Sequence, residues 1–327
     1  MALAESHPAS AAMLSKGRKQ PPANGVYTEL ETLLNLRFFA NELQLKTIKN
    51  SRASVSGGVR TRFRGRGMEF EEVRVYHPGD DIRTIDWRVT ARTQVPHTKV
   101  FREERERPTF IAADQRSNLF FGSQRCFKSV LCAQLASILA WAALQNNDRV
   151  GGMVFGNHEH SDIRPRRSKH AVLEFIHHLN DYNHALSSPL ISDREVTSTS
   201  MLEDLRRLAK PGSAVYLVSD FLDYNEECDE QLYLLSRHTD VTLFQVFDPL
   251  EKNLPNKGLL SVTNGAERLQ IHTNRKRFRD NYAEHIQQRF DLLEQQCKRL
   301  KTALFRFSCS DNEFEQLRSI YARRKSR

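Results

Sequence analysis

Short, continuously apolar runs alternate with helical patterns over the last two thirds of the chain, and this alternation limits the fold more than any other feature. The apolar runs predict strands at 109–114, 149–155, 214–220 and 241–248, separated by helices at 124–146, 170–179, 202–208 and around 230–236. Strands that are apolar on both faces are typical of parallel sheets covered by helices on both sides. We therefore predict a doubly wound, mostly parallel α/β sheet within residues 108–327.

Four further elements follow these units, and two different segments precede them. The pattern predicts a hairpin of 259–262 with 269–272, a helix at 279–300, a strand at 302–307 and a helix at 312–323. Residues 1–24 lack apolar periodicity and are predicted to be a disordered leader. Residues 25–107 are predicted to hold one or two short helices from Thr28 onward and an irregular, charged β arm with a turn at Pro78–Asp81.

Composition restricts the class of protein and its compartment. The 327 residues are 39% hydrophobic, which is enough to fill the core of a large α/β domain. The five cysteines include no C-x-x-C pair, so we expect reduced thiols in the cytoplasm and neither a disulfide framework nor a zinc site. No apolar stretch long enough to cross a membrane and no signal peptide is recognised.

Positive charge is concentrated toward the C-terminus. The net charge is +9, and residues 275–327 alone hold 14 Lys and Arg against 7 Asp and Glu, a net charge of +7. A basic surface of this kind favours an acidic protein partner, with nucleic acid or anionic lipid as alternatives.

Three of the predicted strands end in an aspartate, namely Asp114, Asp220 and Asp248. Ligands of open parallel sheets bind outside the carboxyl ends of the strands, where the strand order reverses. If Asp114 and Asp220 end neighbouring strands, their carboxylates share one crevice and require a cation or a hydrogen-bond network. A divalent metal site and a pair of helix N-caps are both consistent with these positions.

Several charged motifs in the N-terminal part carry a resemblance to a known family. They are Arg64–Phe70, Val73–Arg83 and Ile85–Arg92, supported by Phe101–Glu106, Pro211–Ser213, Ser219–Phe221 and Asp248–Glu251. The signature positions of the arm are Arg64, Gly65, Arg66, Gly67, Glu69, Phe70, Arg74, Pro78, Gly79, Asp80, Asp81, Arg83, Asp86, Trp87 and Arg92. From about Tyr27 to its end, the chain resembles the bacterial domain of unknown function 58 proteins. That resemblance implies a von Willebrand factor A-like, Rossmann-like core.

The metal-adhesion motif of such cores is altered in this sequence. The motif is Asp-x-Ser-x-Ser, completed by a Thr from a second loop and an Asp from a third. The chain reads Asp114-Gln115-Arg116-Ser117-Asn118, so the aspartate is kept while Arg116 and Asn118 replace the serines. The resemblance points to Thr199 or Ser200 for the second loop and to Asp220 for the third.

A guanidinium brings a fixed positive charge and five donors to a place where a hard cation needs oxygen ligands. We therefore expect Arg116 to replace the metal and to bridge Asp114 and Asp220. The crevice is expected to hold no metal and no cofactor, with Mg²⁺ as the disfavoured alternative, and to bind a partner instead.

A second motif overlaps the same loop. Residues Gly122–Ser129 have the spacing of a phosphate-binding P-loop, but Phe127 stands at the position of the second glycine. A side chain there obstructs the close backbone approach that phosphates need. We interpret this segment as a helix start with a buried Phe127 and not as a nucleotide site.

The arginines of the arm have two interpretations. Arg60, Arg62, Arg64 and Arg66 alternate, which on a strand would place them on one face, as in a phosphate-binding strip. Acidic residues interleave with the arginines from Glu69 onward, which favours an intramolecular ion-pair lattice. We expect Trp87 to be buried as the anchor that packs this arm on the α/β domain.

The resemblance implies a non-catalytic adaptor of a MoxR-type AAA+ ATPase, acting in the assembly or remodelling of a client protein complex. The sequence holds no H-E-x-x-H motif and no recognisable catalytic triad, so we expect no enzymatic activity. The alternatives are a nucleic-acid-binding protein using the arm and the basic C-terminus, and, more weakly, a hydrolase whose metal is held by Asp114 and Asp220.

Overall fold

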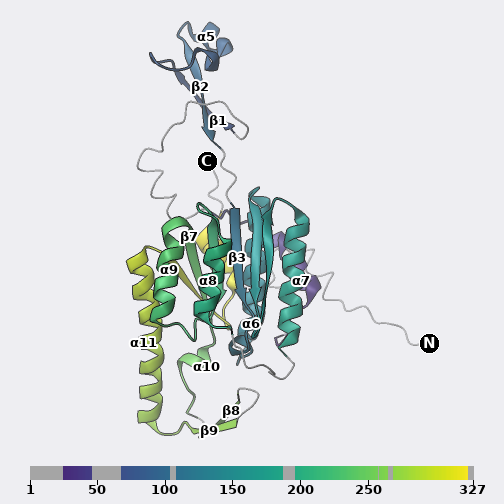
Figure 1. The fold of residues 1–327 in the computed structure, drawn as a ribbon, viewed down its shortest axis with the longest axis vertical. Helices are drawn as coiled ribbons and strands as arrows, with labels where there is room; N and C mark the ends of the chain where they lie inside the picture. Colours follow the sequence, from purple (N-terminus) through teal and green to yellow (C-terminus); the bar gives the residue numbers. More distant parts are fainter. Residues whose placement is uncertain are drawn as a thin grey trace, which may run out of the picture. The chain divides into compact units, whose positions relative to one another are not determined.

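The computed structural model describes residues 25–45, 68–103, 108–186, 196–256, 258–263 and 268–322 (Figure 1). The chain divides into two compact units, one formed by residues 1–46 with 108–327 and the other by residues 47–107. The predicted leader (residues 1–24), the arginines from Arg60 to Arg66 and Gly67 lie outside the described residues.

The larger unit is built on a six-stranded sheet with the order β10-β7-β6-β3-β4-β5. The strands are β3 (Pro108–Asp114), β4 (Arg149–Phe155), β5 (His160–Arg166), β6 (Ala214–Ser219), β7 (Asp240–Phe247) and β10 (Ala303–Ser308). All neighbours pair in parallel except β4 and β5. The strand order reverses between β3 and β6, as in doubly wound sheets, so the predicted fold class is confirmed.

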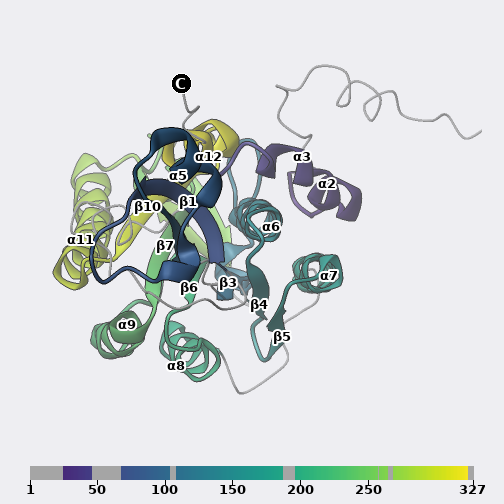
Figure 2. The same ribbon diagram turned by 90° about the horizontal axis from the view of Figure 1, so that it is seen from above.

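Alternate residues of the strands pack against two separate layers of helices (Figure 2). Ile111 and Ala113 of β3 belong to one core and Phe110 and Ala112 to the other, because successive strand residues point to opposite faces. The first core includes α2 (Leu30–Asn35), α3 (Arg37–Ala40), α6 (Lys128–Gln145), α7 (Lys169–Ala185) and α12 (Glu313–Tyr321). The second includes α8 (Ser198–Leu208), α9 (Glu226–His238) and α11 (Lys276–Leu300).

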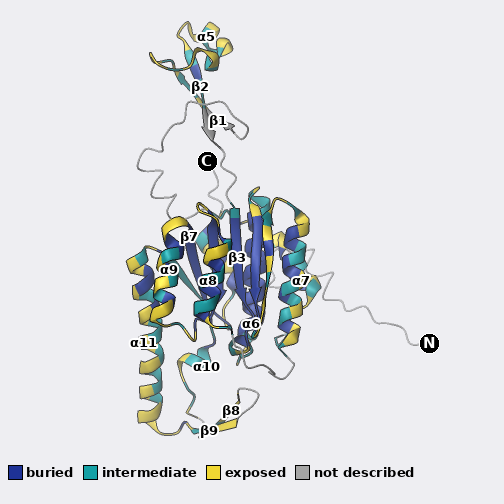
Figure 3. Cartoon of the chain, viewed as in Figure 1, coloured by how far each residue is buried: buried dark blue, intermediate teal, exposed yellow. Residues whose placement is uncertain are grey.

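Helix α6 is apolar on all sides because it is enclosed on all sides. It contacts the sheet, α7 and the N-terminal helices α2 and α3, and every residue from Lys128 to Ala143 is buried (Figure 3). By length and composition α6 is the one described helix that could cross a membrane, yet 89% of it is buried inside the fold. Such burial is typical of a core helix.

Strand β5 is the element of the sheet that the sequence did not predict. It is the antiparallel edge strand, and its residues are exposed or half-exposed apart from Ile163. A strand that contacts the core through so few residues lacks the continuous apolar run on which the prediction of the other strands rested.

After β7 the chain forms the short helix α10 (Pro249–Lys252) and a separate hairpin of β8 (Leu259–Thr263) with β9 (Arg268–His272), and then enters α11. The predicted hairpin is confirmed. Helix α11 begins at Lys276, three residues earlier than predicted, and α7 continues to Ala185, six residues beyond the predicted end.

The smaller unit is a hairpin whose middle is helical. Strands β1 (Met68–Val75) and β2 (His97–Glu103) pair in antiparallel, and η1 (Ile82–Thr84) and α5 (Trp87–Thr93) lie between them. The predicted irregular hairpin is confirmed, and its irregularity is this helical insertion. Asp81 caps η1 through the Arg83 amide, and Asp86 caps α5.

The charges of this unit are only partly paired as expected. Arg74 Nη2 lies 2.8 Å from Asp80 Oδ1, and this hydrogen bond lowers the pKa of Asp80. Asp86 pairs with Lys99 and not with a neighbouring arginine. Within this unit taken by itself, the expectation of a buried Trp87 is wrong, because its side chain is 68% exposed at the first position of α5.

Candidate functional site

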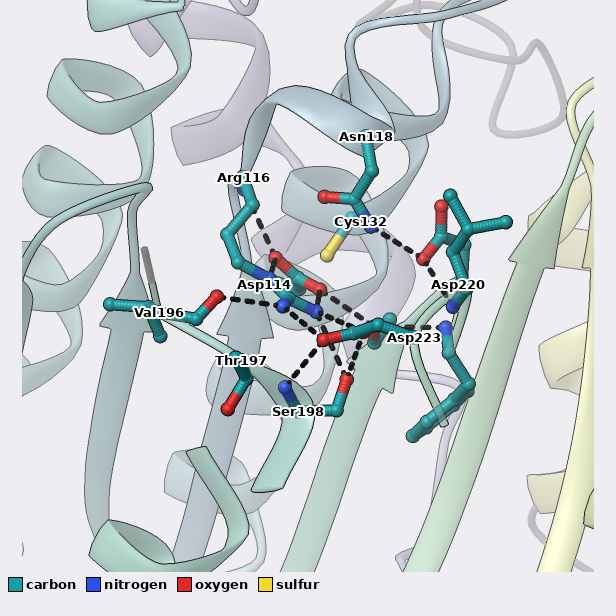
Figure 4. Close-up of polar contacts among 12 residues, drawn as sticks. Asp114, Arg116, Asn118, Cys132, Val196, Thr197, Ser198, Asp220 and Asp223 are labelled. Carbon is teal, nitrogen blue, oxygen red and sulfur yellow. Dashed lines mark hydrogen bonds and ion pairs between the residues drawn. The ribbon is translucent and has the colours of Figure 1, made fainter. Parts of the chain in front are cut away.

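The altered motif lies at the point where the strand order reverses. Asp114 is the last residue of β3 and Asp220 directly follows β6, and these two strands pair in parallel. The expectation that both carboxylates lie at one end of neighbouring strands is therefore confirmed (Figure 4). Asp114 is fully buried, and Asp220 is 8% exposed.

One edge of the Arg116 side chain holds Asp114. Arg116 Nε donates to Asp114 Oδ1 at 3.0 Å and Nη2 donates to Oδ2 at 2.8 Å, which is the paired geometry that arginine forms with carboxylates. The backbone N–H of Arg116 also donates to Oδ1, at 3.0 Å. Ser219 at the end of β6 donates its hydroxyl to Oδ2 at 2.7 Å, so both buried oxygens are satisfied.

The other edge of Arg116 joins two further loops. Nη1 donates to the Val196 carbonyl at 2.9 Å and to Asp223 Oδ2 at 3.0 Å. Nη2 contacts Asp223 Oδ1 and the Ser198 hydroxyl at 3.2 and 3.1 Å. All three nitrogens of the guanidinium are thus engaged, and the residue is only 6% exposed. Arg116 ties the loops after β3, before α8 and after β6 to one another.

The expected bridge from Arg116 to Asp220 is wrong, because the second carboxylate on Arg116 is Asp223. Asp220 instead accepts from Asn118 Nδ2 at 2.8 Å and pairs with Lys128 Nζ at 2.7 Å. Lys128 also pairs with Glu251 of α10 at 2.5 Å. The crevice therefore holds two adjacent ion-pair clusters, each with one cation between two carboxylates.

The hydroxyl in the site comes from Ser198 and not from Thr199 or Ser200. Ser198 is the first residue of α8, and its amide and hydroxyl both donate to Asp223. Thr199 Oγ1 lies 3.4 Å from Cys228 Sγ, and Ser200 forms a capping box with Thr197. Consecutive side chains in the first turn of a helix point in different directions, so only one of these three residues can direct its hydroxyl into the site.

Burial and charge act against each other throughout the site. Burial alone would lower the pKa of Arg116, but the charges and hydrogen bonds of Asp114 and Asp223 raise it above its ordinary value. The pKa of Lys128 is raised in the same way by Asp220 and Glu251. Both cations are therefore charged at any physiological pH. Burial would raise the pKa of Asp223, but Arg116 and Ser198 hold it below its ordinary value.

The donor set does not fit a divalent metal. Both oxygens of Asp114 accept from Arg116, and Asp220 is taken by Lys128 and Asn118. Within the described part of the chain, no group of three His, Cys, Asp or Glu side chains could hold an ion. A metal ion here would have to displace a buried arginine or lysine whose charge the carboxylates of the site already neutralise. That the native site is metal-free stays a prediction.

The P-loop-like segment does not form a phosphate cradle. Lys128 is 1% exposed and directed at Asp220 and Glu251, whereas a P-loop lysine is free to reach phosphate oxygens. Phe127 is the N-cap of α6, and it is partly buried and packs against the first core. The predicted helix start is confirmed, whereas Phe127 is half-buried and not buried as expected; Lys128 belongs to the ion-pair cluster.

Sequence reasoning missed Asp223, Ser198, Lys128 and Glu251 as members of the site. Asp223 and Ser198 each stand within three residues of a predicted member, and Lys128 lies in the P-loop-like segment Gly122–Ser129. The presence of an arginine in a buried aspartate motif was a usable signal. Because one carboxylate satisfies only one edge of a guanidinium, the arginine indicates a second carboxylate nearby.

The fold and the site together define a class of protein: a doubly wound, mostly parallel α/β protein in which an arginine holds the strand-end aspartate. The chain belongs to the family described as Protein of unknown function DUF58, whose model matches residues 72–290. The predicted family is thereby confirmed.

Sequence relatives include uncharacterized proteins of Mycobacterium bovis and Mycobacterium tuberculosis. Each is 27% identical over 197 residues, covering 59% of this chain and 59% of the relative. The chain therefore matches about three fifths of the length of these relatives.

Two solved structures are similar. One is the conserved hypothetical protein BatB from Bacteroides thetaiotaomicron, with a TM-score of 0.41, 16% identity and coverage of 65% of this chain and 94% of BatB. The other is an aerotolerance-related membrane protein from Bacteroides fragilis, with a TM-score of 0.39, 14% identity and coverage of 65% and 95%. The fold class stated above rests on the strand order and not on these scores.

Proposed function

We propose that this protein is a non-catalytic protein-interaction module that acts as the adaptor of a MoxR-type AAA+ ATPase in the assembly or remodelling of a client protein complex. Its place of action under this proposal is the cytoplasm. The proposal rests on the resemblance of the motifs and on the chemistry of the strand-end site.

The observation that carries the proposal is that the charged side chains of the site are all paired with one another. Asp114, Arg116 and Asp223 bind one another, and Asp220 and Glu251 share Lys128. A general base or nucleophile must be able to turn to a substrate, and a carboxylate held in a buried ion pair cannot do so without breaking that pair. This arrangement supports a rigid, structural use of the site.

Cysteine chemistry offers no better candidate. All five cysteines are buried. Burial raises the pKa of Cys132, and the charge of Asp114 acts in the same direction, which lowers the thiolate content and the reactivity of Cys132.

The rim of the site remains available to a partner. Arg116 fixes the positions of the β3 and β6 loops, whose outer residues Ser117 and Leu222 are exposed. Loops held by a buried clamp present a surface that needs little ordering on binding, and this favours affinity. The expected binding of a partner in this crevice thus becomes binding over its rim, because Arg116 itself is not accessible.

Direct binding tests the proposal. The purified protein is immobilised, and the purified MoxR-type ATPase of the same genome is titrated by biolayer interferometry with ATP and with ADP. We expect saturable binding that depends on the nucleotide. Another AAA+ ATPase of the same genome is the control and should not bind.

Absence of saturable binding to the MoxR-type ATPase would contradict the proposal. Salt-dependent retention of mixed DNA or RNA would favour a nucleic-acid-binding protein instead. Hydrolysis that depends on a divalent ion and is lost in Asp114→Asn would favour the hydrolase.

A further inference from the structure

The β8–β9 hairpin and the start of α11 combine apolar side chains with a concentration of positive charge. Both follow the carboxyl end of β7, so they lie at the same end of the sheet as the Asp114 site, beside α10 (Figure 1). Their surface is largely exposed (Figure 3). Because this region also lies at the end of the sheet where ligands of such folds bind, it is a candidate contact surface.

One face of the hairpin is apolar. The register pairs Leu260 with Ile271 and Val262 with Leu269, and period-two alternation places all four on the same face. Leu269 is 62% exposed and the other three are half-exposed. Among the described elements β8 and β9 make extensive contacts only with each other. A two-stranded sheet with an open apolar face is marginally stable in water, and such faces mark interaction surfaces.

The charge beside this face is positive. Residues 268–279 hold five Lys and Arg and no Asp or Glu. In the part of the chain that the structure describes, Arg268, Arg275, Lys276 and Arg277 form no ion pair. Lys276 and Arg277 also occupy the first turn of α11, where positive charge opposes the helix dipole. Carboxylates from outside would relieve this repulsion.

The surface is held in place by the turn between β9 and α11. Arg279 Nη1 donates to the Thr273 carbonyl at 2.7 Å and to Asn256 Oδ1 at 3.3 Å. The Thr273 amide donates to the Gly258 carbonyl at 2.6 Å. These bonds join the two ends of the hairpin to the start of α11, so the apolar face and the cations keep a fixed relation.

We infer that this basic hairpin surface, defined as β8, β9 and residues 275–279, is a docking site for a partner protein whose contact patch combines apolar side chains with carboxylates. The inference rests on the proposed function and adds the surface and the chemistry of the partner. An anionic lipid surface is the weaker occupant, because Asp280 and Glu284 are exposed on the following turns of α11 and would meet its negative charge.

Peptide selection tests the partner chemistry without the ATPase. A random phage-displayed library of peptides of about 16 residues, long enough for four helical turns, is selected on the full-length protein. We expect enrichment of peptides that mix Asp and Glu with apolar residues. The triple variant Arg275→Glu, Lys276→Glu, Arg277→Glu and the variant Leu269→Ser should weaken the selected peptides by at least about tenfold.

Matched variants control for net charge and for hairpin stability. Arg206→Glu, Arg207→Glu, Lys210→Glu changes the charge equally at the end of α8 and just beyond it, and Leu259→Ser changes an exposed leucine on the opposite face of the hairpin. Both should change peptide affinity by less than about twofold.

Selected peptides without acidic enrichment, or peptides that bind the triple variant as well as the wild type, would overturn the docking surface even if the ATPase binds. Vesicles of one part phosphatidylglycerol to three parts phosphatidylcholine are tested in parallel. If the wild type binds these vesicles, the triple variant does not, and no acidic peptide is selected, the occupant of the surface is a membrane and not a protein. Failure of the ATPase alone, with acidic peptides bound at this surface, would refute only the proposed function.

Discussion

Replacing Arg116 by alanine should destabilise the protein strongly, because it leaves a buried charge without its partner. Asp114 is fully buried and would lose two charge-assisted hydrogen bonds, keeping only those from Ser219 and the residue 116 amide. Removing one partner of a buried ion pair costs about 3–5 kcal/mol. Protonating an ordinary aspartate at neutral pH costs about 4 kcal/mol. The loss of stability is therefore similar whether the aspartate stays charged or takes up a proton.

The free energy of unfolding from urea titrations at pH 7 measures this loss. Arg116→Lys is the matched variant, since it keeps the charge but cannot hold both oxygens of Asp114, and we expect it to fall between the wild type and Arg116→Ala. Asp223→Asn should cost less, about 1–2 kcal/mol, because that side chain is 38% exposed. A loss below about 1 kcal/mol for Arg116→Ala would refute the reasoning, since a surface pair is worth no more than this.

The other predictions concern the arm, the second cluster and pH. Trp87→Ala should cost less than about 1 kcal/mol while Trp141→Ala, at a 4% exposed position, should cost about 3–5 kcal/mol in urea titrations; equal losses would show that Trp87 is buried. Lys128→Met should cost about 3–5 kcal/mol, and adding Glu251→Gln should recover part of this loss; no recovery would contradict the shared-cation cluster. Because the pKa of Asp223 is lowered in the folded state, its contribution is present above about pH 4 and is lost as the pH falls through the folded value. The urea midpoint of Asp223→Asn should therefore fall less steeply below pH 4 than that of the wild type, and parallel curves would contradict this.

Most of the sheet could be predicted from the sequence because its strands are buried on both faces. The apolar runs that end at Asp114 and Asp220 are continuous, and β3 and β6 lie in the centre of the sheet. The edge strand β5 could not be predicted, because its polar residues face solvent. Trp87 is exposed within its own unit although large aromatic side chains are usually buried, because its place at the start of α5 depends on the fold of the whole arm.

The candidate site was predictable in position and not in its pairing. Asp114 with Arg116 was recognisable from the altered motif, since a guanidinium stands where hydroxyl ligands are expected. The choice of Asp223 over Asp220 depends on where the loop after β6 turns. Phe221 in that loop has φ 53°, in the left-handed region, and such a turn is not visible from composition. Asp220 pairs with Lys128 instead.

Metal binding by the strand-end site tests most directly whether Arg116 takes the place of a cation. Mn²⁺ is titrated into the wild type and into the double variant Arg116→Ser, Asn118→Ser, and the free ion is followed by electron paramagnetic resonance, with the melting temperature as a second readout. We predict that millimolar Mn²⁺ is not bound at this site by the wild type and leaves its melting temperature unchanged. The double variant should bind one ion and be stabilised by it, since it lacks the guanidinium and offers two more oxygens. Stoichiometric binding of Mn²⁺ by the wild type that is lost in Asp114→Asn would contradict this account.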